Sequence, residues 1–249
     1  MVLTKGGIHR IAKDVKYILK NPIDNIYYKH DNENITTGYA LIVGNKDTPY
    51  SNGNYLFEFT FPDNYPYEPP KLKFLTNDGL MRFHPNLYIN GKVCLSIINT
   101  WNGEGWTSCN NINSVLLILT SIFDKESLTF EPGIDKNHYN VKKYDTLVGY
   151  KNIEYSIIKQ IKQLKLLIGL DEKNILLCND KNKCLLLFKD EIFDNFKKNL
   201  EEINNNLEKI ENEHNKKTTT AFLNVSCYSL NFILEFNNLK KELENLNKL

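Results

Sequence analysis

HPNLYINGKVCLS, residues 84–96, is the most informative segment of this chain. It opens with a His-Pro-Asn triplet and continues through a loop with an Asn-Gly pair, and Cys94 follows ten positions after His84. A cysteine close to a histidine suggests a nucleophile. Free cysteine is also among the most buried residue types, so a packed core cysteine is the simpler interpretation. The rest of the sequence has to decide between the two.

A cysteine protease is one function that can be checked directly against this stretch. Its nucleophile needs an imidazole within hydrogen-bond reach and a third group that orients the imidazole. Of the five histidines only His84 lies near Cys94 in the sequence, and Pro85 fixes the backbone directly after it. We therefore interpret His84 as a turn-stabilising side chain and not as a base, which disfavours a protease.

The segments before this stretch predict an α+β fold that starts with a helix and a β-meander. Apolar residues at helical spacing predict a helix from Ile8 to Leu19, which Asn21-Pro22 ends. Ser-Asn-Gly at 51–53 favours a hairpin, and the prolines of PDNYPYEPP (62–70) favour a rigid turn. These turns separate three strand-like runs, at 38–43, 54–61 and 71–76.

The segments after Cys94 predict a loop followed by helices. TWNGEGWTS (100–108) is rich in Gly and Trp and is expected to be a loop. Residues 111–123 predict a strongly apolar helix that is buried on most of its circumference. Residues 137–150 are expected to be helical again.

The chain changes character beyond about Tyr150. Proline disappears, and apolar residues step by three and four along 188–210 and along 232–246. This spacing predicts two long amphipathic helices, separated near 214–220, that pair as a hairpin on the first domain or join a coiled-coil partner. Helix packing alone also explains such stripes. We therefore divide the chain into a domain of residues 1–150 and an α-helical extension of residues 151–249.

Composition narrows the class of protein. The chain has 249 residues, of which 41% are hydrophobic, and 31 basic against 30 acidic side chains give a net charge of +1. That balance lacks the basic excess of a nucleic-acid-binding protein. Five irregularly spaced cysteines without a C-x-x-C pair argue against a disulfide framework or a metal site and favour a reducing compartment.

Targeting signals are not apparent. Charged residues interrupt the apolar positions near the N-terminus, so no signal-peptide core is present there. No apolar run approaches the length needed to span a membrane, and we expect no membrane partner. We therefore expect a cytoplasmic or nuclear protein.

Several motifs in a fixed order resemble those of ubiquitin-conjugating enzymes. FPDNYPYEPPKLKF (61–74) precedes HPN and its cysteine, a Trp-containing loop follows, and EPG stands at 131–133. Their order and spacing are highly specific and cover roughly the first 150 residues. The long loop NTWNGEGW, the segment GKVCLSI and the C-terminal extension are similar to the long Z branch of this family. The resemblance implies the UBC fold, an antiparallel meander flanked by helices.

The resemblance also implies a reaction. Members of this family take ubiquitin or a ubiquitin-like modifier as a thioester from an activating enzyme and pass it to a lysine of a protein substrate, usually with a ubiquitin ligase. Cys94 would carry the thioester. Because the incoming carbonyl is already activated, a modest thiolate fraction suffices and the missing base is explained. The activating enzyme uses the ATP, and no cofactor is expected here. Residues 151–249 contain no catalytic cluster, so we expect a chain truncated near Tyr150 to keep some activity.

Four residues around Cys94 take roles from the resemblance. Asn86 would donate to the oxyanion that forms when an amine attacks, or would hold the loop beside Cys94. Pro85 and His84 would shape that loop. Glu131 matches an acidic residue at the mouth of the site, which would position or help deprotonate the acceptor lysine. A plain turn residue is the alternative for Asn86, and a solvated surface carboxylate is the alternative for Glu131.

Partner surfaces also follow from the resemblance. Arg10, Lys13 and Lys16 lie on the polar side of the first helix, where the family binds the activating enzyme, although a solvated helix face explains the same charges. Tyr67 and Trp106 match the two loops that bind a ligase, and exposed aromatic residues there would be typical anchors. Trp106 has a second interpretation, as a side chain that fills the core.

Some positions depart from the family pattern. Trp-Thr-Ser-Cys at 106–109 replaces the commoner Trp-Ser-Pro, which leaves ligase choice open, and we interpret Cys109 as a packed bystander. Phe83 stands where a tyrosine is usual, which removes a hydroxyl from the flank of the site. Ser96 stands where many members have an acidic residue, which makes the surroundings of Cys94 less negative.

Two rival interpretations remain from the sequence. A non-catalytic variant of the same fold would act as a ubiquitin-binding scaffold, but such variants lack the cysteine, and this chain keeps Cys94 and Asn86. A conjugating enzyme for another modifier is the second rival, because the surface that recognises the modifier is not a short motif.

Overall fold

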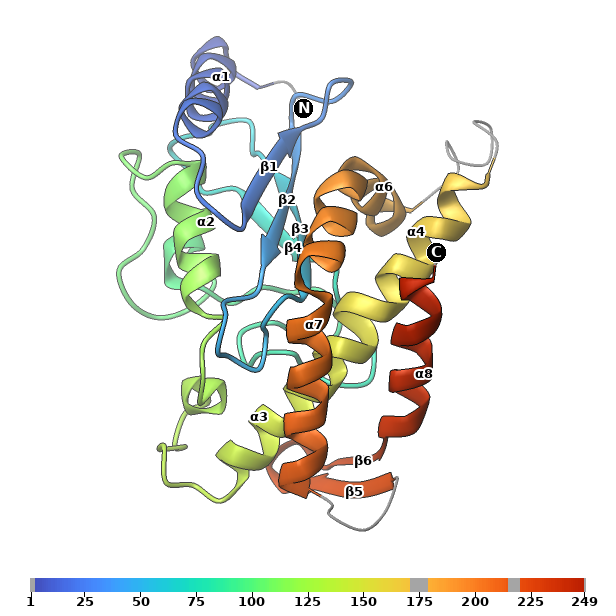
Figure 1. The fold of residues 1–249 in the computed structure, drawn as a ribbon. Helices are drawn as coiled ribbons and strands as arrows, with labels where there is room; N and C mark the ends of the chain where they lie inside the picture. The colour runs from blue at the N-terminus through green and yellow to red at the C-terminus, as the bar shows by residue number, and fades with distance from the viewer. Residues whose placement is uncertain (1–2, 171–178, 215–219, 249) are drawn as a thin grey trace.

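An antiparallel meander of four strands forms the centre of the fold (Figure 1). The computed structural model describes residues 3–170, 179–214 and 220–248. The predicted α+β class and the three predicted strand runs are confirmed, and one strand that the sequence analysis missed precedes them. The strands are adjacent in chain order: β1 (Ile26–His30), β2 (Thr37–Val43), β3 (Asn54–Thr60) and β4 (Lys71–Phe74).

The β2–β3 hairpin is the most deeply buried part of the sheet. Val43 pairs with Asn54 next to the turn, and Thr37 pairs with Thr60 at the other end. Most residues of both strands are buried, so they are covered on more than one side. α2 (Ile112–Ser121) contacts β2, and α6 (Asp180–Leu187) contacts β3 from the C-terminal part of the chain.

Side-chain caps fix where two of the helices begin. The hydroxyl of Thr4 accepts a 3.0 Å hydrogen bond from the backbone N–H of Gly7 at the start of α1 (Lys5–Lys20). Asn111 and Ser114 form a capping box at the start of α2. Both predicted helices are confirmed, and α2 ends at Ser121, two residues before the predicted end.

One long helix crosses the domain boundary that the sequence suggested. α3 (Asn140–Lys151), the π-helical segment η3 (Asn152–Lys159) and α4 (Gln160–Ile168) follow one another without a break. Stretches of π-helix are rare and often mark functional sites. The division at Tyr150 therefore falls inside a helix, and whether residues 1–150 fold alone stays a prediction.

The second half of this helix is bonded to the sheet. The Tyr55 hydroxyl donates to Oδ1 of Asn152 over 2.7 Å, and the side-chain amide of Asn54 donates to the carbonyl oxygen of Ser156 over 3.0 Å. The side-chain amide of Gln160 donates to the carbonyl oxygen of Asn54 over 2.9 Å. Because all five residues are buried, residues beyond Tyr150 complete the hydrogen bonding of β3.

Two further helices lie beside α4 in the extension (Figure 1). α7 (Lys189–His214) and α8 (Phe236–Asn247) contact one another, and Lys240 pairs with Glu211 over 2.5 Å. α7 is kinked at Asn199, where the backbone leaves helical geometry. The predicted pairing of two amphipathic helices is confirmed for these two.

A β-hairpin between α7 and α8 corrects the prediction of helix through residues 232–235. β5 (Thr220–Val225) pairs antiparallel with β6 (Leu230–Glu235), so Phe232 lies in a strand. Residues 230–235 alternate in exposure along the strand, whereas Phe232 and Phe236 happen to be four apart, which mimics a helical step. Of the break predicted at 214–220, residues 215–219 lie outside the described residues.

An aromatic cluster fills the core beneath the Cys94 loop. The rings of Tyr55 and Phe123 stack with centroids 4.2 Å apart, and Tyr50 meets Phe123 edge-on at 5.1 Å. The hydroxyl of Tyr50 donates to the carbonyl oxygen of Phe83 over 2.7 Å. Phe83 is fully buried, so the segment that leads into His84 is fixed by the core.

Candidate active site

The loop from His84 to Cys94 folds back on itself and brings its two ends together. Isolated bridges pair His84 with Leu87 and Leu87 with Val93. Gly91 allows the reversal, because its φ of 88° is a conformation that other residues rarely adopt. The backbone N–H of Cys94 donates to the carbonyl oxygen of Asn86 over 2.9 Å. The sequence spacing thus brings Cys94 next to Asn86.

Asn86 holds this loop closed through its side chain. Its side-chain amide donates to the carbonyl oxygen of Cys94 over 2.5 Å, and its backbone N–H donates to Nδ1 of His84 over 3.0 Å. The amide nitrogen carries two hydrogens, so one remains after the bond to Cys94. The bond to Cys94 fits the loop-holding role predicted for Asn86. The remaining amide hydrogen is the candidate donor to an oxyanion.

His84 is a buried, neutral histidine. Its side chain is fully buried, and burial lowers the pKa of the imidazole to about 3. Nδ1 accepts from Asn86, so Nε2 carries the proton, and the ring meets Phe130 edge-on at 4.8 Å. A base facing Cys94 would need a free imidazole nitrogen with a pKa near neutrality. His84 does not meet that requirement, which agrees with the structural role that we predicted for it.

Cys94 lines a small cavity together with the other candidate residues. The cavity measures about 20 Å³, and its lining includes Asn86, Glu131 and the ring of Trp101. This volume has room for about one water molecule. Cys94 itself is only 3% exposed. The structure therefore brings Cys94, Asn86, Pro85 and Glu131 to one place, as the sequence analysis expected.

Glu131 has partners that the sequence did not reveal. Its Oε2 accepts a 2.6 Å hydrogen bond from the hydroxyl of Tyr228, and the guanidinium of Arg82 lies 3.9 Å from the same oxygen. Glu131 is thus not a simple solvated carboxylate. Tyr228 lies in a part of the chain without family motifs, so no signal in the sequence pointed to it.

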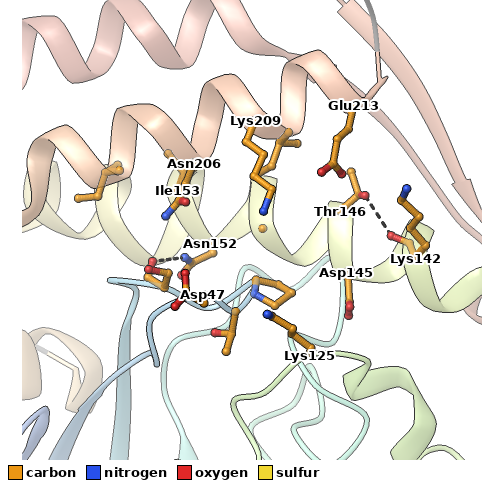
Figure 2. A pocket seen from close by; sticks show the side chains of 16 residues that line it. Asp47, Lys125, Lys142, Asp145, Thr146, Asn152, Ile153, Asn206, Lys209 and Glu213 are labelled. Atoms are coloured by element: carbon orange, nitrogen blue, oxygen red, sulfur yellow. Dashed lines mark hydrogen bonds between the residues drawn. The ribbon is translucent and has the colours of Figure 1, made fainter. Parts of the chain in front are cut away.

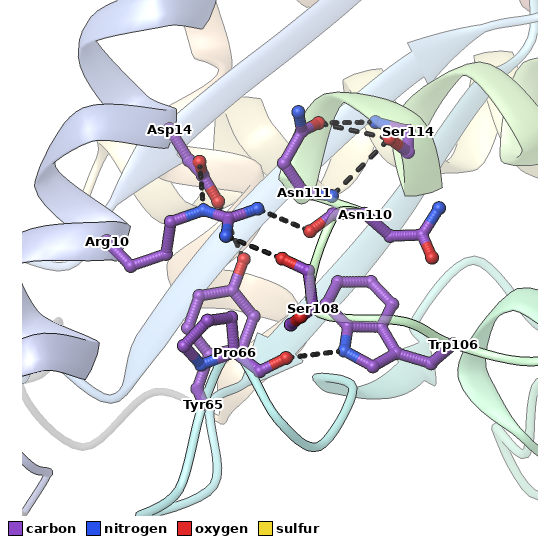
Figure 3. A network of polar contacts seen from close by, with 9 residues as sticks. All are labelled: Arg10, Asp14, Tyr65, Pro66, Trp106, Ser108, Asn110, Asn111 and Ser114. Atoms are coloured by element: carbon purple, nitrogen blue, oxygen red, sulfur yellow. Dashed lines mark hydrogen bonds and ion pairs between the residues drawn. The ribbon is translucent and has the colours of Figure 1, made fainter.

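Arg10 is committed to contacts within the chain (Figure 3). Its guanidinium pairs with the buried Asp14 at 2.9 Å and donates to the carbonyl oxygens of Ser108 and Asn110 at 2.8 and 2.5 Å. The hydroxyl of Tyr65 donates to the second oxygen of Asp14 over 2.7 Å. This network ties α1 to the loop that follows Cys94. Lys13 and Lys16, in contrast, are exposed on α1.

The two aromatic residues expected to bind a ligase differ in exposure. Tyr67 is 80% exposed, whereas Trp106 is 9% exposed. The indole N–H of Trp106 donates to the carbonyl oxygen of Pro66 over 2.8 Å, which joins the two loops. Of the two interpretations of Trp106, an exposed anchor or a side chain that fills the core, the structure supports the second, because the ring is buried and packs against Tyr65. The interpretation of Cys109 as a packed residue is wrong, since Cys109 is exposed.

A larger cavity lies apart from Cys94, where α7 passes over α3 (Figure 2). It measures about 250 Å³, and lysines and acids line it in equal numbers. Burial raises the pKa of Asp145, one of these acids, to about 6. This cavity shares no lining residue with the one at Cys94, so it is not part of the candidate active site at Cys94.

Within residues 3–170, 179–214 and 220–248, no group of three or more His, Cys, Asp or Glu is arranged to hold a metal ion. None of the helices in those ranges combines the length and the apolar character that crossing a membrane requires.

Comparison with known proteins adds a family match. The family model described as "Ubiquitin-conjugating enzyme" matches residues 10–149, which include the loop from His84 to Cys94 and Glu131. The match ends before η3 and before the β5–β6 hairpin.

Two similar curated proteins are named "Ubiquitin-conjugating enzyme E2 Z". The one from Xenopus tropicalis is 35% identical over 155 residues, which cover 61% of this chain and 50% of the relative. The one from Homo sapiens is 36% identical over 151 residues, which cover 59% of this chain and 43% of the relative. The chain thus spans half or less of the length of these two relatives.

A solved structure that resembles this one is the human ubiquitin-conjugating enzyme E2 G1. It has 28% sequence identity and a TM-score of 0.43, and the match covers 49% of this chain and 98% of the other chain.

Proposed function

Because the chain belongs to the ubiquitin-conjugating enzyme family, close to its Z branch, we propose that Cys94 accepts ubiquitin or a ubiquitin-like modifier as a thioester and passes it to a substrate lysine. The antiparallel meander with flanking helices is the UBC fold, extended here by helices and a β-hairpin. One observation carries the proposal. Cys94 and Asn86 are joined by two hydrogen bonds in one loop, and Glu131 lines the same cavity.

Charging is a thioester exchange. The Cys94 thiolate attacks the carbonyl carbon of the modifier, the new bond to Sγ forms, and the bond to the activating enzyme's sulfur breaks. The departing thiolate takes up the proton that Cys94 lost. One thiolate replaces another, so the reaction needs no resident strong base. This requirement fits a loop whose histidine is neutral and buried.

Transfer to lysine, in contrast, requires that an oxyanion be stabilised. The neutral amine attacks the thioester carbonyl, a tetrahedral intermediate with an oxyanion forms, and the Cys94 thiolate leaves. The second amide hydrogen of Asn86 is our proposed donor to the oxyanion. Glu131 is our proposed site for the acceptor amine, where a carboxylate favours the approach of lysine and receives its proton.

Partner surfaces follow from the exposed residues. We propose that Lys13 and Lys16 meet the activating enzyme, with Arg10 holding α1 in place because its guanidinium is bonded to the 108–110 loop. We propose that Tyr67 contacts a ligase directly, because it is 80% exposed. Trp106 would act there by fixing the loop. The proposed location remains the cytoplasm or the nucleus.

A charging assay tests the function and identifies the modifier. The purified chain is mixed with an activating enzyme, ATP and one modifier at a time, and the products are separated with and without a thiol reductant. We expect one modifier to give a product shifted by its own mass that disappears on reduction. Absence of such a product with every cognate pair of activating enzyme and modifier would contradict the proposal.

A further inference from the structure

The turn of the C-terminal β-hairpin reaches the cavity that contains Cys94. η4 (Ser226–Tyr228) forms this turn, and Ser229 closes it with a φ of 53°. The hydroxyl of Tyr228 donates to Oε2 of Glu131 over 2.6 Å, although the two residues are 97 positions apart. Because Glu131 lines the cavity with Cys94, a residue of the extension contacts the acidic group of the candidate site.

The ring of Tyr228 is held between two neighbours. Tyr144 meets it edge-on with centroids 5.9 Å apart, and the guanidinium of Arg82 lies 5.3 Å from its centroid. Arg82 also stacks on Tyr88 at 3.7 Å and donates to the carbonyl oxygen of Pro85 over 3.3 Å. Tyr228 is therefore fixed relative to the loop that carries Cys94.

The turn has an anchor that does not involve Glu131. The hydroxyl oxygen of Ser226 lies 2.6 Å from the hydroxyl of Tyr139 and accepts a 3.0 Å hydrogen bond from the side-chain amide of Asn140. Val225, next to the turn, is fully buried. The hairpin is thus held against the start of α3 independently of Tyr228, whose bond to Glu131 fixes the carboxylate.

The direction of this hydrogen bond is set by the protonation of Tyr228. Burial and the neighbouring Glu131 carboxylate raise the pKa of the Tyr228 hydroxyl, so it keeps its proton at physiological pH. The hydroxyl therefore donates and the carboxylate accepts. A glutamate side chain loses considerable rotamer freedom when it is fixed, and this bond fixes it before any acceptor arrives.

We propose that Tyr228 is a positioning residue: it holds the Glu131 carboxylate by one oxygen and leaves the other oxygen for the acceptor lysine amine. This inference rests on the proposed function, in which Glu131 places the acceptor. It makes the C-terminal hairpin part of the working site, since the hydroxyl is supplied from beyond the region that the family model matches.

The test follows discharge of the charged chain to free lysine in a single turnover. Charged wild type, Tyr228→Phe, Glu131→Gln and the double variant are each mixed with increasing lysine concentrations. Phenylalanine keeps the ring and removes the hydroxyl only. For Tyr228→Phe we expect an unchanged charging rate and a half-saturating lysine concentration raised by about 10-fold, the lower end of the range expected for one hydrogen bond to a charged group. The double variant should match Glu131→Gln within about 2-fold, because both changes act on one interaction.

Tyr139→Phe is the matched control. It removes the hydroxyl that contacts Ser226 on the same turn but does not touch Glu131. Normal lysine dependence in Tyr139→Phe supports the inference, whereas an equal loss there would assign the effect to a loosened hairpin and overturn it. Wild-type kinetics in Tyr228→Phe, or losses that multiply in the double variant, would overturn it as well. A wild-type chain that takes no modifier onto Cys94 would instead refute the proposed function and this inference with it.

Discussion

The side-chain amide of Asn86 donates a hydrogen bond to the carbonyl oxygen of Cys94, eight positions along the chain. Asn86, which is proposed to stabilise the oxyanion, therefore also holds the backbone of Cys94 in place. The amide can do both because it has two hydrogens. Any substitution of Asn86 changes both functions, so a test has to separate them.

Asn86→Ala is expected to discharge slowly to free lysine while it still charges at nearly the wild-type rate. Loss of one oxyanion donor typically slows the step by about 100- to 1000-fold. Charging depends less on that donor because thiolate is both nucleophile and leaving group. The lost bond to Cys94 should lower the free energy of unfolding by about 1 kcal/mol, measured by urea denaturation.

Asn90→Ala provides the control from the same loop. The side-chain oxygen of Asn90 accepts from the backbone N–H of Lys92 over 3.0 Å and has no bond to Cys94. It should discharge normally. Equal slowing of charging and discharge in Asn86→Ala would favour a purely structural role, and normal discharge would remove Asn86 from the reaction.

Lys151 is expected to be the most sensitive charge in the helix that crosses the proposed boundary. It is buried and pairs with Asp78 at 2.9 Å and with Glu154 at 2.5 Å. Lys151→Met leaves the buried carboxylate of Asp78 without its cation, which typically costs about 3–5 kcal/mol of stability. Lys159 pairs with the same Glu154 from a 52% exposed position, so Lys159→Met should cost less than about 1 kcal/mol. Similar denaturation midpoints for the two variants would contradict the prediction that Lys151 contributes more to stability than Lys159.

A chain that ends at Tyr150 is expected to lose cooperative folding, the opposite of what the sequence alone suggested. Truncation removes the buried partners of Asn54 and Tyr55 and four buried isoleucines at 153, 157, 158 and 161. Burying one such side chain is worth about 1.5–3 kcal/mol, so the sum approaches the whole stability of a typical domain. Circular dichroism during heating should show no sharp transition. A sharp transition together with retained charging would support residues 1–150 as an independent domain.

The sequence was most informative where local pattern and turn chemistry agreed. β2, β3 and α2 could be predicted because turn and capping residues bound each apolar run. β1 was missed because its five residues are too short and too mixed to show a period. In the β5–β6 hairpin the spacing of Phe232 and Phe236 favoured the wrong period.

In the candidate site, too, local features could be predicted from the sequence and tertiary contacts could not. The His84–Cys94 loop was predictable because its geometry is encoded within eleven residues, including Pro85 and Gly91. The bond between Tyr228 and Glu131 was not, because only tertiary packing of the extension brings them together. The sequence also left two interpretations of Trp106 open, because the carbonyl that accepts from its indole N–H lies forty positions earlier.

His84 is expected to make stability depend on pH. Its pKa is about 3 in the folded chain and about 6.5 when unfolded, so the unfolded state binds the proton more readily between these values. Stability should therefore fall as pH falls, by about 2 kcal/mol from this residue between pH 7 and pH 5. Asp145 acts in the opposite direction, because its raised pKa of about 6 lets the folded state bind a proton first.

Comparison with His84→Asn isolates this contribution. The amide oxygen of the substituted side chain can still accept from the backbone N–H of Asn86, but it does not titrate. Urea denaturation of both proteins at several pH values should show a shallower fall between pH 7 and pH 5 in the variant, while the contribution of Asp145 cancels. If the stability of the two proteins falls in parallel with pH, the pKa of His84 is not lowered in the folded chain and the prediction is wrong.

The measurement that most directly tests the account is the chemical nature of the modifier linkage in Cys94→Ser. Serine places an oxygen where Sγ lies, so charging should give an oxyester that survives a thiol reductant but is cleaved by hydroxide. Cys109→Ser and Cys227→Ser, which alter exposed cysteines, should still form a thiol-sensitive product. The account predicts that only Cys94→Ser changes the linkage. A thiol-sensitive product on the Cys94→Ser chain would place the thioester on another cysteine and contradict the central claim.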